Sequence, residues 1–295
     1  MATVSSGSTS ERFGFVQTYG KDLGIKYLCD WLKVSRSGYY AWLKRGISAR
    51  SLSDVALLKN IKLIFDRHRQ TYGSPRVFYA LCKQGIRTSK KRVARLMKES
   101  GLRARALKTY RSRVKVKHFY QAIENKRNDI GAPTNINQQW SGDVTYLRVG
   151  RRWYYLAVVL DLFSRRVIGW SFSDKKDTTL TLNAIKQALK RKGKKSRVMF
   201  HSDRGAEYRA HHVQAYLTSQ GVESSMNRPG ICTDNAEVES FFHSLKADII
   251  RGNKYQNIEK MRAQLRSYLN YFYNRQRLHS SLGYKTPAEF ESALS

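Results

Sequence analysis

Two aspartates stand in sequence contexts where an acid is unusual. Asp143 lies in the middle of the strand-like run "WSGDVTYL", and Asp203 ends the apolar run "RVMFHSD". A carboxylate at either place is costly unless it binds something. Simpler explanations remain open, namely an exposed strand face for Asp143 and an Asx-type turn onto Gly205 for Asp203.

Glu239 adds a third carboxylate, on a segment with helical periodicity, "TDNAEVESFFHSLK". Spacings of four and three residues place four polar side chains on one face: Asn235, Glu239, His243 and Lys246. The opposite stripe is apolar and suited to packing on a sheet: Val238, Phe241, Phe242 and Leu245. A solvated glutamate is the alternative, but this pattern is typical of a helix that presents a catalytic edge.

Three converging carboxylates in a basic protein suit divalent cations. Oxygen ligands favour Mg²⁺, with Mn²⁺ as a substitute. Two such ions about 3.5–4 Å apart can activate the attacking oxygen and stabilise the leaving oxygen of a phosphodiester displacement. The pattern therefore predicts a metal-dependent site made of Asp143, Asp203 and Glu239.

The net charge indicates a polyanionic partner. The 295 residues carry 55 Lys and Arg against 22 Asp and Glu, which gives +33. We expect nucleic acid, with an anionic membrane surface as the weaker alternative. The longest apolar run, residues 153–160, is too short to span a bilayer. Cys29, Cys82 and Cys232 are far apart and fit neither a disulfide framework nor a metal-binding spacing, so we expect thiols in a reducing cytoplasm.

The chain up to about residue 103 predicts only helices. Residues 1–19 are expected to form a flexible tail, and residues 20–50 a DNA-binding unit of two short helices. In its first helix Leu23, Tyr27 and Trp31 have the spacing of one face, and Ser35 is the N-cap of the second.

Residues 51–103 predict a helix-turn-helix domain, with a long helix from Ser53 and then a pair of helices that end at Gly85 and Gly101. The second helix of the pair has Ser89 as its N-cap. From Arg87 to Lys117 there are 13 basic residues and one acid, a density that favours phosphate contacts over a merely solvated helix face. Residues 104–135 are interpreted as a basic linker that follows DNA, with a plain connector as the alternative.

Residues 136–252 predict an α/β fold, a mixed five-stranded sheet flanked by helices. Three strands form a meander, over residues 139–149, 152–163 and 165–173. Helices and strands then alternate, with strands over residues 196–203 and 222–227. Residues 253–295 predict a C-terminal helical extension, with further helix over 257–283 and a terminal turn that starts at "TPAEF".

Several blocks of the chain resemble the DDE transposases of the insertion-sequence-three family, in the retroviral-integrase superfamily. Thirty-five residues separate Asp203 from Glu239, which is the family's spacing, and Lys246 follows Glu239 by seven. The upstream helical pair resembles the family's helix-turn-helix, and the resemblance covers roughly residues 20–292. The blocks are "WSGDVTYL", "HSDRGAEY", "DNAEVESFFHSLK", "YLNYFYNRQRLHSSLGYKTPAEF", "VSRSGYYAWLKR" and "TYGSPRVFYALCKQGIRTSKKRVARLMKESGL".

The resemblance implies a ribonuclease-H-like core in which Asp143, Asp203 and Glu239 are the catalytic, metal-binding triad. The reaction is hydrolysis at the ends of an insertion sequence, then attack of the freed 3′-hydroxyl on another phosphodiester, so no protein nucleophile is expected. Lys246 would contact a DNA phosphate near the scissile bond, with Asn235 and His201 as supports. Further predicted DNA contacts are Arg204, Lys90, Lys91, Arg92, Arg95, Arg103, Arg105, Arg111 and Arg113.

The expected partner is double-stranded DNA, both the terminal inverted repeats and the target, bound by a homodimer or higher oligomer in a bacterial cytoplasm, at the nucleoid. The chain resembles the family's downstream frame, so an upstream-frame protein is an expected partner or fusion. Glu207 departs from the family, which usually has glutamine there. Two alternatives stay open: a DNA-binding regulator without catalysis, and a nuclease that cuts without joining.

Overall fold

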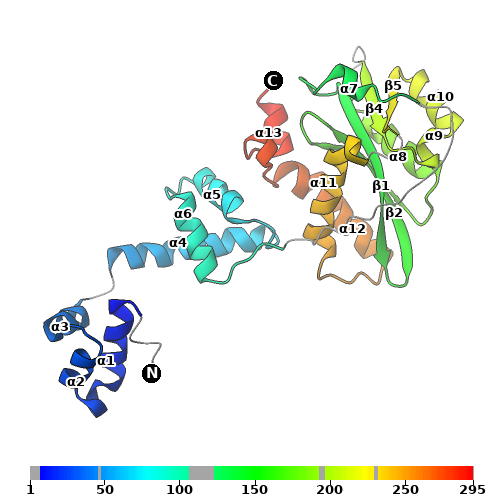
Figure 1. The fold of residues 1–295 in the computed structure, drawn as a ribbon. Coiled ribbons are helices and arrows are strands. Elements are labelled where there is room, and N and C mark those ends of the chain that lie inside the picture. The colour runs from blue at the N-terminus through cyan, green and yellow to red at the C-terminus, as the bar shows by residue number, and fades with distance from the viewer. Residues whose placement is uncertain (1–6, 46–47, 106–122, 193–196, 229–231, 295) are drawn as a thin grey trace. The chain divides into compact units, whose positions relative to one another are not determined.

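The computed structural model describes residues 7–45, 48–105, 123–192, 197–228 and 232–294 (Figure 1). The chain forms two compact units, Met1–Lys62 and Leu63–Ser295. The long helix α4 (Ala49–Arg67) begins four residues before the Ser53 expected from the sequence. Among the described helices, none is both long enough and apolar enough to cross a membrane.

The first unit contains the helices α1 (Thr9–Leu23), α2 (Ile25–Trp31) and α3 (Arg36–Lys44). The flexible tail expected over residues 1–19 is therefore wrong from Thr9 onward. The reason is a capping box. The backbone N–H of Glu11 donates to the Ser8 hydroxyl at 3.3 Å, and the Glu11 carboxylate accepts from the Ser8 N–H at 2.7 Å.

The apolar face predicted for this unit is also wrong. Leu23, Tyr27 and Trp31 are exposed. Gly24 separates α1 from α2 with φ at 84°, a left-handed conformation that glycine adopts readily, so the three residues do not share one helix. The buried cluster consists instead of Phe13, Val16, Leu28, Cys29, Leu32 and Tyr39.

The predicted helix-turn-helix pair is present in the second unit as α5 (Ser74–Lys83) and α6 (Lys90–Glu99). The Ser89 hydroxyl accepts a hydrogen bond from the Arg92 N–H at 3.2 Å, which confirms the predicted N-cap. The buried faces of the two helices are Val77, Ala80 and Leu81 in α5, and Val93, Leu96 and Met97 in α6.

The predicted mixed sheet is confirmed, with strand order β3-β2-β1-β4-β5. The first three strands form an antiparallel meander, and the last two run parallel to β1. Their bounds are β1 Gln139–Val149, β2 Arg152–Asp161, β3 Val167–Ser173, β4 Val198–Ser202 and β5 Val222–Met226.

Helices cover both faces of the sheet (Figure 1). Leu156 and Val158 of β2 pack under α11 (Ala236–Leu245) and α12 (Ile258–Ser267), whereas Ala157 and Val159 pack under α8 (Thr178–Leu189) and α10 (His211–Ser219). Successive side chains of β2 point to opposite faces of the sheet and therefore belong to two separate hydrophobic cores. The remaining short elements are α7 (Arg127–Ile130), α9 (Ala206–Arg209) and η1 (Cys232–Asn235).

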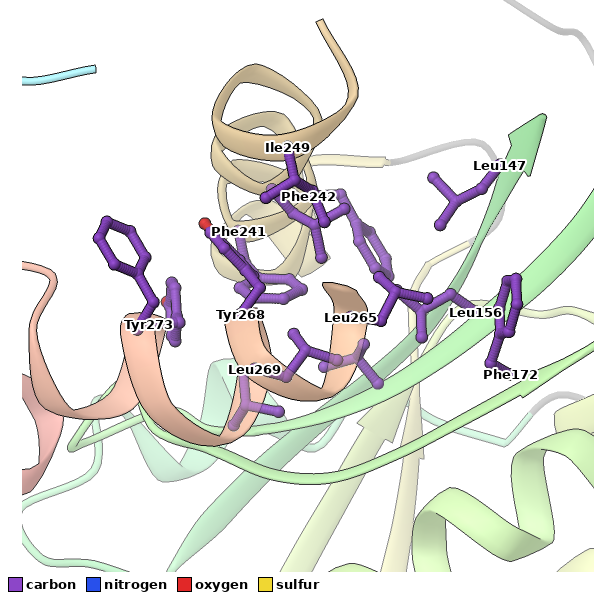
Figure 2. Packing of buried hydrophobic residues seen from close by; sticks show 14 of the residues in the cluster. Leu147, Leu156, Phe172, Phe241, Phe242, Ile249, Leu265, Tyr268, Leu269 and Tyr273 are labelled. Carbon is purple, nitrogen blue, oxygen red and sulfur yellow. The ribbon is translucent and has the colours of Figure 1, made fainter. Parts of the chain in front are cut away.

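The helix expected over residues 257–283 is present but is not one continuous α-helix. Helix α12 continues into a π-helical turn, η3 (Tyr268–Tyr273), and the chain then reaches the short turn η4 (Ser280–Leu282) and α13 (Pro287–Ser292). Figure 2 shows Tyr268, Leu269 and Tyr273 of η3 in the same buried cluster as Phe241 and Phe242 of α11. Helix α11 also ends in a π-helical turn, η2 (Lys246–Ile250).

A buried ion pair joins these two π-helical turns to the helix-turn-helix. The Nε of Arg277 lies 2.8 Å from the Oδ2 of Asp248, which also accepts a hydrogen bond from the Tyr268 hydroxyl at 2.7 Å. The backbone N–H of Leu278 donates to the Tyr72 hydroxyl at 2.8 Å. Residues that are remote in sequence are therefore held together by polar contacts away from water.

We expect Arg277→Met to lower the free energy of unfolding by about 3–5 kcal/mol, because it leaves the Asp248 carboxylate buried and without its charge partner. Chemical denaturation monitored by circular dichroism measures this change. Arg275→Met is the matched control, since Arg275 is exposed two residues earlier, and it should change stability little. Equal effects of the two substitutions would contradict the importance of the ion pair.

Candidate active site

The pairing of β1 with β4 brings two of the predicted acids side by side. Gly142 of β1 pairs with Ser202 of β4 in parallel register, so Asp143 and Asp203 follow at the same level of neighbouring strands. Such strands lie about 4.8 Å apart. Asp143 Oδ1 accepts a hydrogen bond from the Val144 N–H at 2.7 Å, and Asp203 Oδ1 accepts one from the Gly205 N–H at 2.9 Å.

The glycine before Asp143 is required by packing. A Cβ at Gly142 would lie 2.4 Å from the ring of Phe200 and 3.4 Å from the Tyr208 hydroxyl. The two aromatic rings, with centroids 5.9 Å apart, therefore occupy the space next to the strand where it presents Asp143.

Asn235 connects the third acid to this strand. Its side chain is buried, its carbonyl oxygen accepts from the Ser141 hydroxyl, and its Nδ2 donates to the Gly142 carbonyl at 3.3 Å. These contacts hold the start of α11 against β1, just before Asp143. Glu239 follows one turn later and is exposed, while Val238 and Phe241 enter the core, as the helical pattern predicts.

The electrostatics of the three acids are coupled. Burial raises the pKa of Asp143 to about 7, and the negative charges of Asp203 and Glu239 add to the rise. Burial also raises the pKa of Asp203, to which the charge of Glu207 contributes, and it raises the pKa of Glu239. The charge of each acid acts on Asp143, so in the absence of a cation the cluster disfavours full ionisation.

Lys176 is a residue of this site that the sequence did not indicate. Its ammonium lies 2.9 Å from Oε1 of the buried Glu207. Burial lowers the pKa of Lys176, but the hydrogen bond and charge of Glu207, with the charges of Asp203 and Asp143, raise it overall. The segment "SDKKDTT" has the composition of any polar loop, and only the tertiary structure places this cation among the acids.

Lys246 also lies near the cluster. It begins η2, and its Nζ is 4.9 Å from the centroid of the Tyr146 ring. Burial lowers the pKa of Lys246, and the charge of Asp143 works in the opposite direction. The amine thus stands between an aromatic face and the acids, where it can meet a phosphate.

The oxygen atoms of the three carboxylates are the kind of ligand that a hard divalent cation prefers. Three carboxylates supply oxygen ligands, and a cation would relieve their mutual repulsion. Within the described ranges, however, no three His, Cys, Asp or Glu side chains are close enough to hold an ion as they stand. The acids therefore have to come closer together to share one.

Three residues predicted for the site have polar atoms engaged inside the fold. His201 is fully buried, with Nδ1 2.9 Å from Ser225 Oγ and Nε2 2.7 Å from Asn227 Oδ1. Arg204 is partly buried and donates to the carbonyls of Asn227 and Ile123. The polar atoms of His201 and Asn235 are thus engaged inside the fold, as expected of supports of the site, whereas Arg204 stays a predicted DNA contact.

The basic residues of the helix-turn-helix lie at the surface. Lys90 and Lys91 are exposed, and the Lys90 ammonium is 5.0 Å from the Tyr79 ring centroid. Arg92 is partly buried, and Arg95 pairs with Glu99 at 2.9 Å. Arg103 and Arg105 are exposed, and Arg105 donates to the Gln70 side chain. Arg111 and Arg113 lie outside the described residues.

Family models and relatives agree with this architecture. Residues 133–232 and 220–287 match models of an integrase core domain, and residues 53–110 match an HTH-like domain. The transposase InsF for insertion sequence IS3A from Escherichia coli (strain K12) is 38% identical over 283 residues, covering 95% of this chain and 98% of the relative. An uncharacterized 31 kDa protein of insertion element IS600 from Shigella sonnei is 35% identical, covering 89% of this chain and 97% of the relative.

Solved structures with some likeness include the HTLV-2 integrase catalytic core domain in complex with magnesium, at 19% identity and a TM-score of 0.38, covering 52% of this chain and 96% of that one. The catalytic domain of the Mos1 mariner transposase has 14% identity and a TM-score of 0.36, covering 46% and 71%. On the strength of the sequence relatives and the matched domains, the chain belongs to the IS3 family of DDE transposases, enzymes with an integrase core domain that cleave DNA and transfer its strands.

Proposed function

We propose that Asp143, Asp203 and Glu239 hold two Mg²⁺ ions, or Mn²⁺ in their place, while the enzyme acts on the ends of its insertion sequence. The parallel pairing of β1 with β4 carries this proposal, because it sets two carboxylates at one level of adjacent strands. When bound, such ions activate an attacking oxygen and stabilise a leaving oxygen.

The protein's own side chains supply binding and position. The Lys246 ammonium pairs with a phosphate oxygen beside the acids, and Asn235 holds α11 against β1 one turn before Glu239. Water attacks in the cleavage step and a DNA 3′-hydroxyl in the joining step, so no side chain has to form a covalent intermediate. Loss of the Asn235 side chain should therefore affect catalysis by changing the position of Glu239.

The proposed partner is double-stranded DNA, as element ends and as target. The exposed basic residues of α6 support contact with phosphates, and their charge predicts binding that weakens steeply with salt. Two element ends have to meet before strand transfer, so we propose a dimer or higher oligomer on DNA, with an upstream-frame protein as partner or fusion. Action on chromosomal DNA places the enzyme in the cytoplasm, at the nucleoid.

We expect Asp203→Asn and Glu239→Gln each to reduce cleavage and strand transfer by about 10²–10³-fold or more, the loss typical of removing an essential electrostatic group. The assay uses purified full-length protein, labelled element-end DNA and Mg²⁺. Binding of Mn²⁺, followed by electron paramagnetic resonance, should weaken in parallel. Glu259→Gln on the exposed start of α12 is the control.

Wild-type rates in Asp203→Asn would remove Asp203 from the site. Cut products without joined products in the wild-type protein would instead favour a nuclease. DNA binding without either product would favour a regulator that only binds DNA.

We expect Asp143→Asn to stabilise the metal-free protein above about pH 7. The folded state raises the pKa of Asp143 to about 7 from its ordinary value of 3.8, so the wild-type fold loses stability as the pH rises from about 4 to 7, by up to about 1.4 kcal/mol per pH unit. The gain from asparagine should be largest above pH 7 and shrink as the pH falls through that window. Thermal unfolding in EDTA at a series of pH values measures it, and a gain that is independent of pH would contradict the charge repulsion.

A further inference from the structure

A second concave site lies beside α11, away from the three acids. It is a hollow of about 340 Å³ whose floor includes Leu160, Phe241 and Tyr273. Ser240 and Ser244 of α11 line it, and they lie about 100° around the helix from Glu239 and His243. The other walls come from the helix-turn-helix, the turn before β3 and the segment after η3.

Three arginines converge on this hollow: Arg76 of α5, Arg165 of the turn before β3, and Arg277. The charges of all three lower the pKa of His279, after burial, which is the largest cause. Burial lowers the pKa of Arg76, and the charge of Arg277 lowers it further. The guanidinium groups of Arg76 and Arg277 are therefore close enough to repel each other, an arrangement that an anion would stabilise.

The acids near the hollow are already engaged. Asp248 pairs with Arg277, and Glu237, the one carboxylate among the lining residues of the described chain, pairs with Arg127 and lies 3.6 Å from Arg165. The Nε of Arg76 donates to the carbonyl of Leu278 at 3.0 Å. Within the described part of the chain, Arg76 has no carboxylate partner, so its charge remains available.

His279 has an unpartnered polar atom in the hollow. The residue is 9% exposed, it lines the hollow, and its Nε2 is buried without a hydrogen-bond partner among the described residues. A buried polar atom without a partner is uncommon and costly. The ring also hydrogen-bonds to the backbone of Tyr273, an interaction that raises the pKa of His279. The neutral ring therefore has its proton on the nitrogen that makes this bond, and its Nε2 is an acceptor in the hollow.

We propose that this hollow binds one backbone phosphate of double-stranded DNA through Arg76 and Arg165, with the hydroxyls of Ser240 and Ser244 as further donors. Arginine forks and hydroxyl groups are the usual ligands of a DNA phosphate. The inference rests on the proposed action on DNA and adds to it a contact outside the carboxylate site.

This placement has a consequence for the active site. Arg76 comes from the helix-turn-helix, whereas Ser240 and Ser244 belong to the helix that carries Glu239. A single phosphate in the hollow would therefore bridge the DNA-binding helices and the catalytic helix. It would fix where the duplex enters relative to Glu239.

The test measures binding of a fluorescent duplex of arbitrary sequence by anisotropy, in EDTA, over a series of salt concentrations. All proteins carry Asp203→Asn, so catalysis cannot affect the result. Arg76→Gln and Arg165→Asn remove one charge each. Asn suits position 165, where φ is 59°. Arg76→Lys keeps the charge, and Arg262→Gln is the control, an exposed arginine of α12.

We expect Arg76→Gln and Arg165→Asn each to reduce the slope of log affinity against log salt by up to about 0.9, the contribution of one phosphate. The double variant should lose about the same amount, since both side chains bind one phosphate. Arg76→Lys should retain most of the slope. Arg262→Gln should leave the slope near that of the parent protein.

Slopes for the two pocket variants equal to that of Arg262→Gln would overturn the proposal, and so would a loss of about 1.8 in the double variant, which indicates two separate phosphates. If Arg76→Gln fails to fold by circular dichroism, Arg165→Asn decides the outcome. Failure of the parent protein to bind DNA at all would refute the proposed function itself, which separates the two results.

Discussion

The parallel pairing of β1 with β4 is the contact on which the rest of the structure depends. It places Asp143 and Asp203 at one level of neighbouring strands, where two carboxylates repel each other unless a cation or a proton intervenes. A fold tolerates such a cluster only when the surrounding packing holds it in place. Here two cores, one on each face of the sheet, supply that packing.

The residues around the acids hold their backbone segments in place and bring positive charge close to the carboxylates. Asn235 fixes α11 to β1, and Gly142 leaves space for Phe200 and Tyr208 beneath the strand. Lys176 and Lys246 bring positive charge toward the cluster without neutralising it, since the pKa of Asp143 remains raised to about 7. The acids therefore remain able to respond to a cation, which is the property expected of a metal-dependent site.

The departure of Glu207 from the family's usual glutamine has a physical account in these contacts. The side chain is buried, and the ammonium of Lys176 lies 2.9 Å from it. The ammonium of Lys176 thus balances the charge of Glu207. The remaining effect of Glu207 on the triad is to raise the pKa of Asp203. Glu207 is therefore part of the electrostatic environment of the triad.

The sequence alone determined the features that depend on local patterns. The period-two strands, the amphipathic helix of Glu239 and the Ser35 and Ser89 caps each depend on neighbouring residues. Hydrogen bonds over three or four residues are local, so propensity and periodicity suffice to predict them.

Only the tertiary structure decided the rest. The exposure of Leu23, Tyr27 and Trp31, the π-helical turns, the burial of His201, and the approach of Lys176 to the acids all depend on residues distant in the chain. The same holds for the Arg76, Arg165 and His279 hollow, whose walls come from four separate segments. No local pattern encodes these features, because each is set by which remote surface covers a side chain.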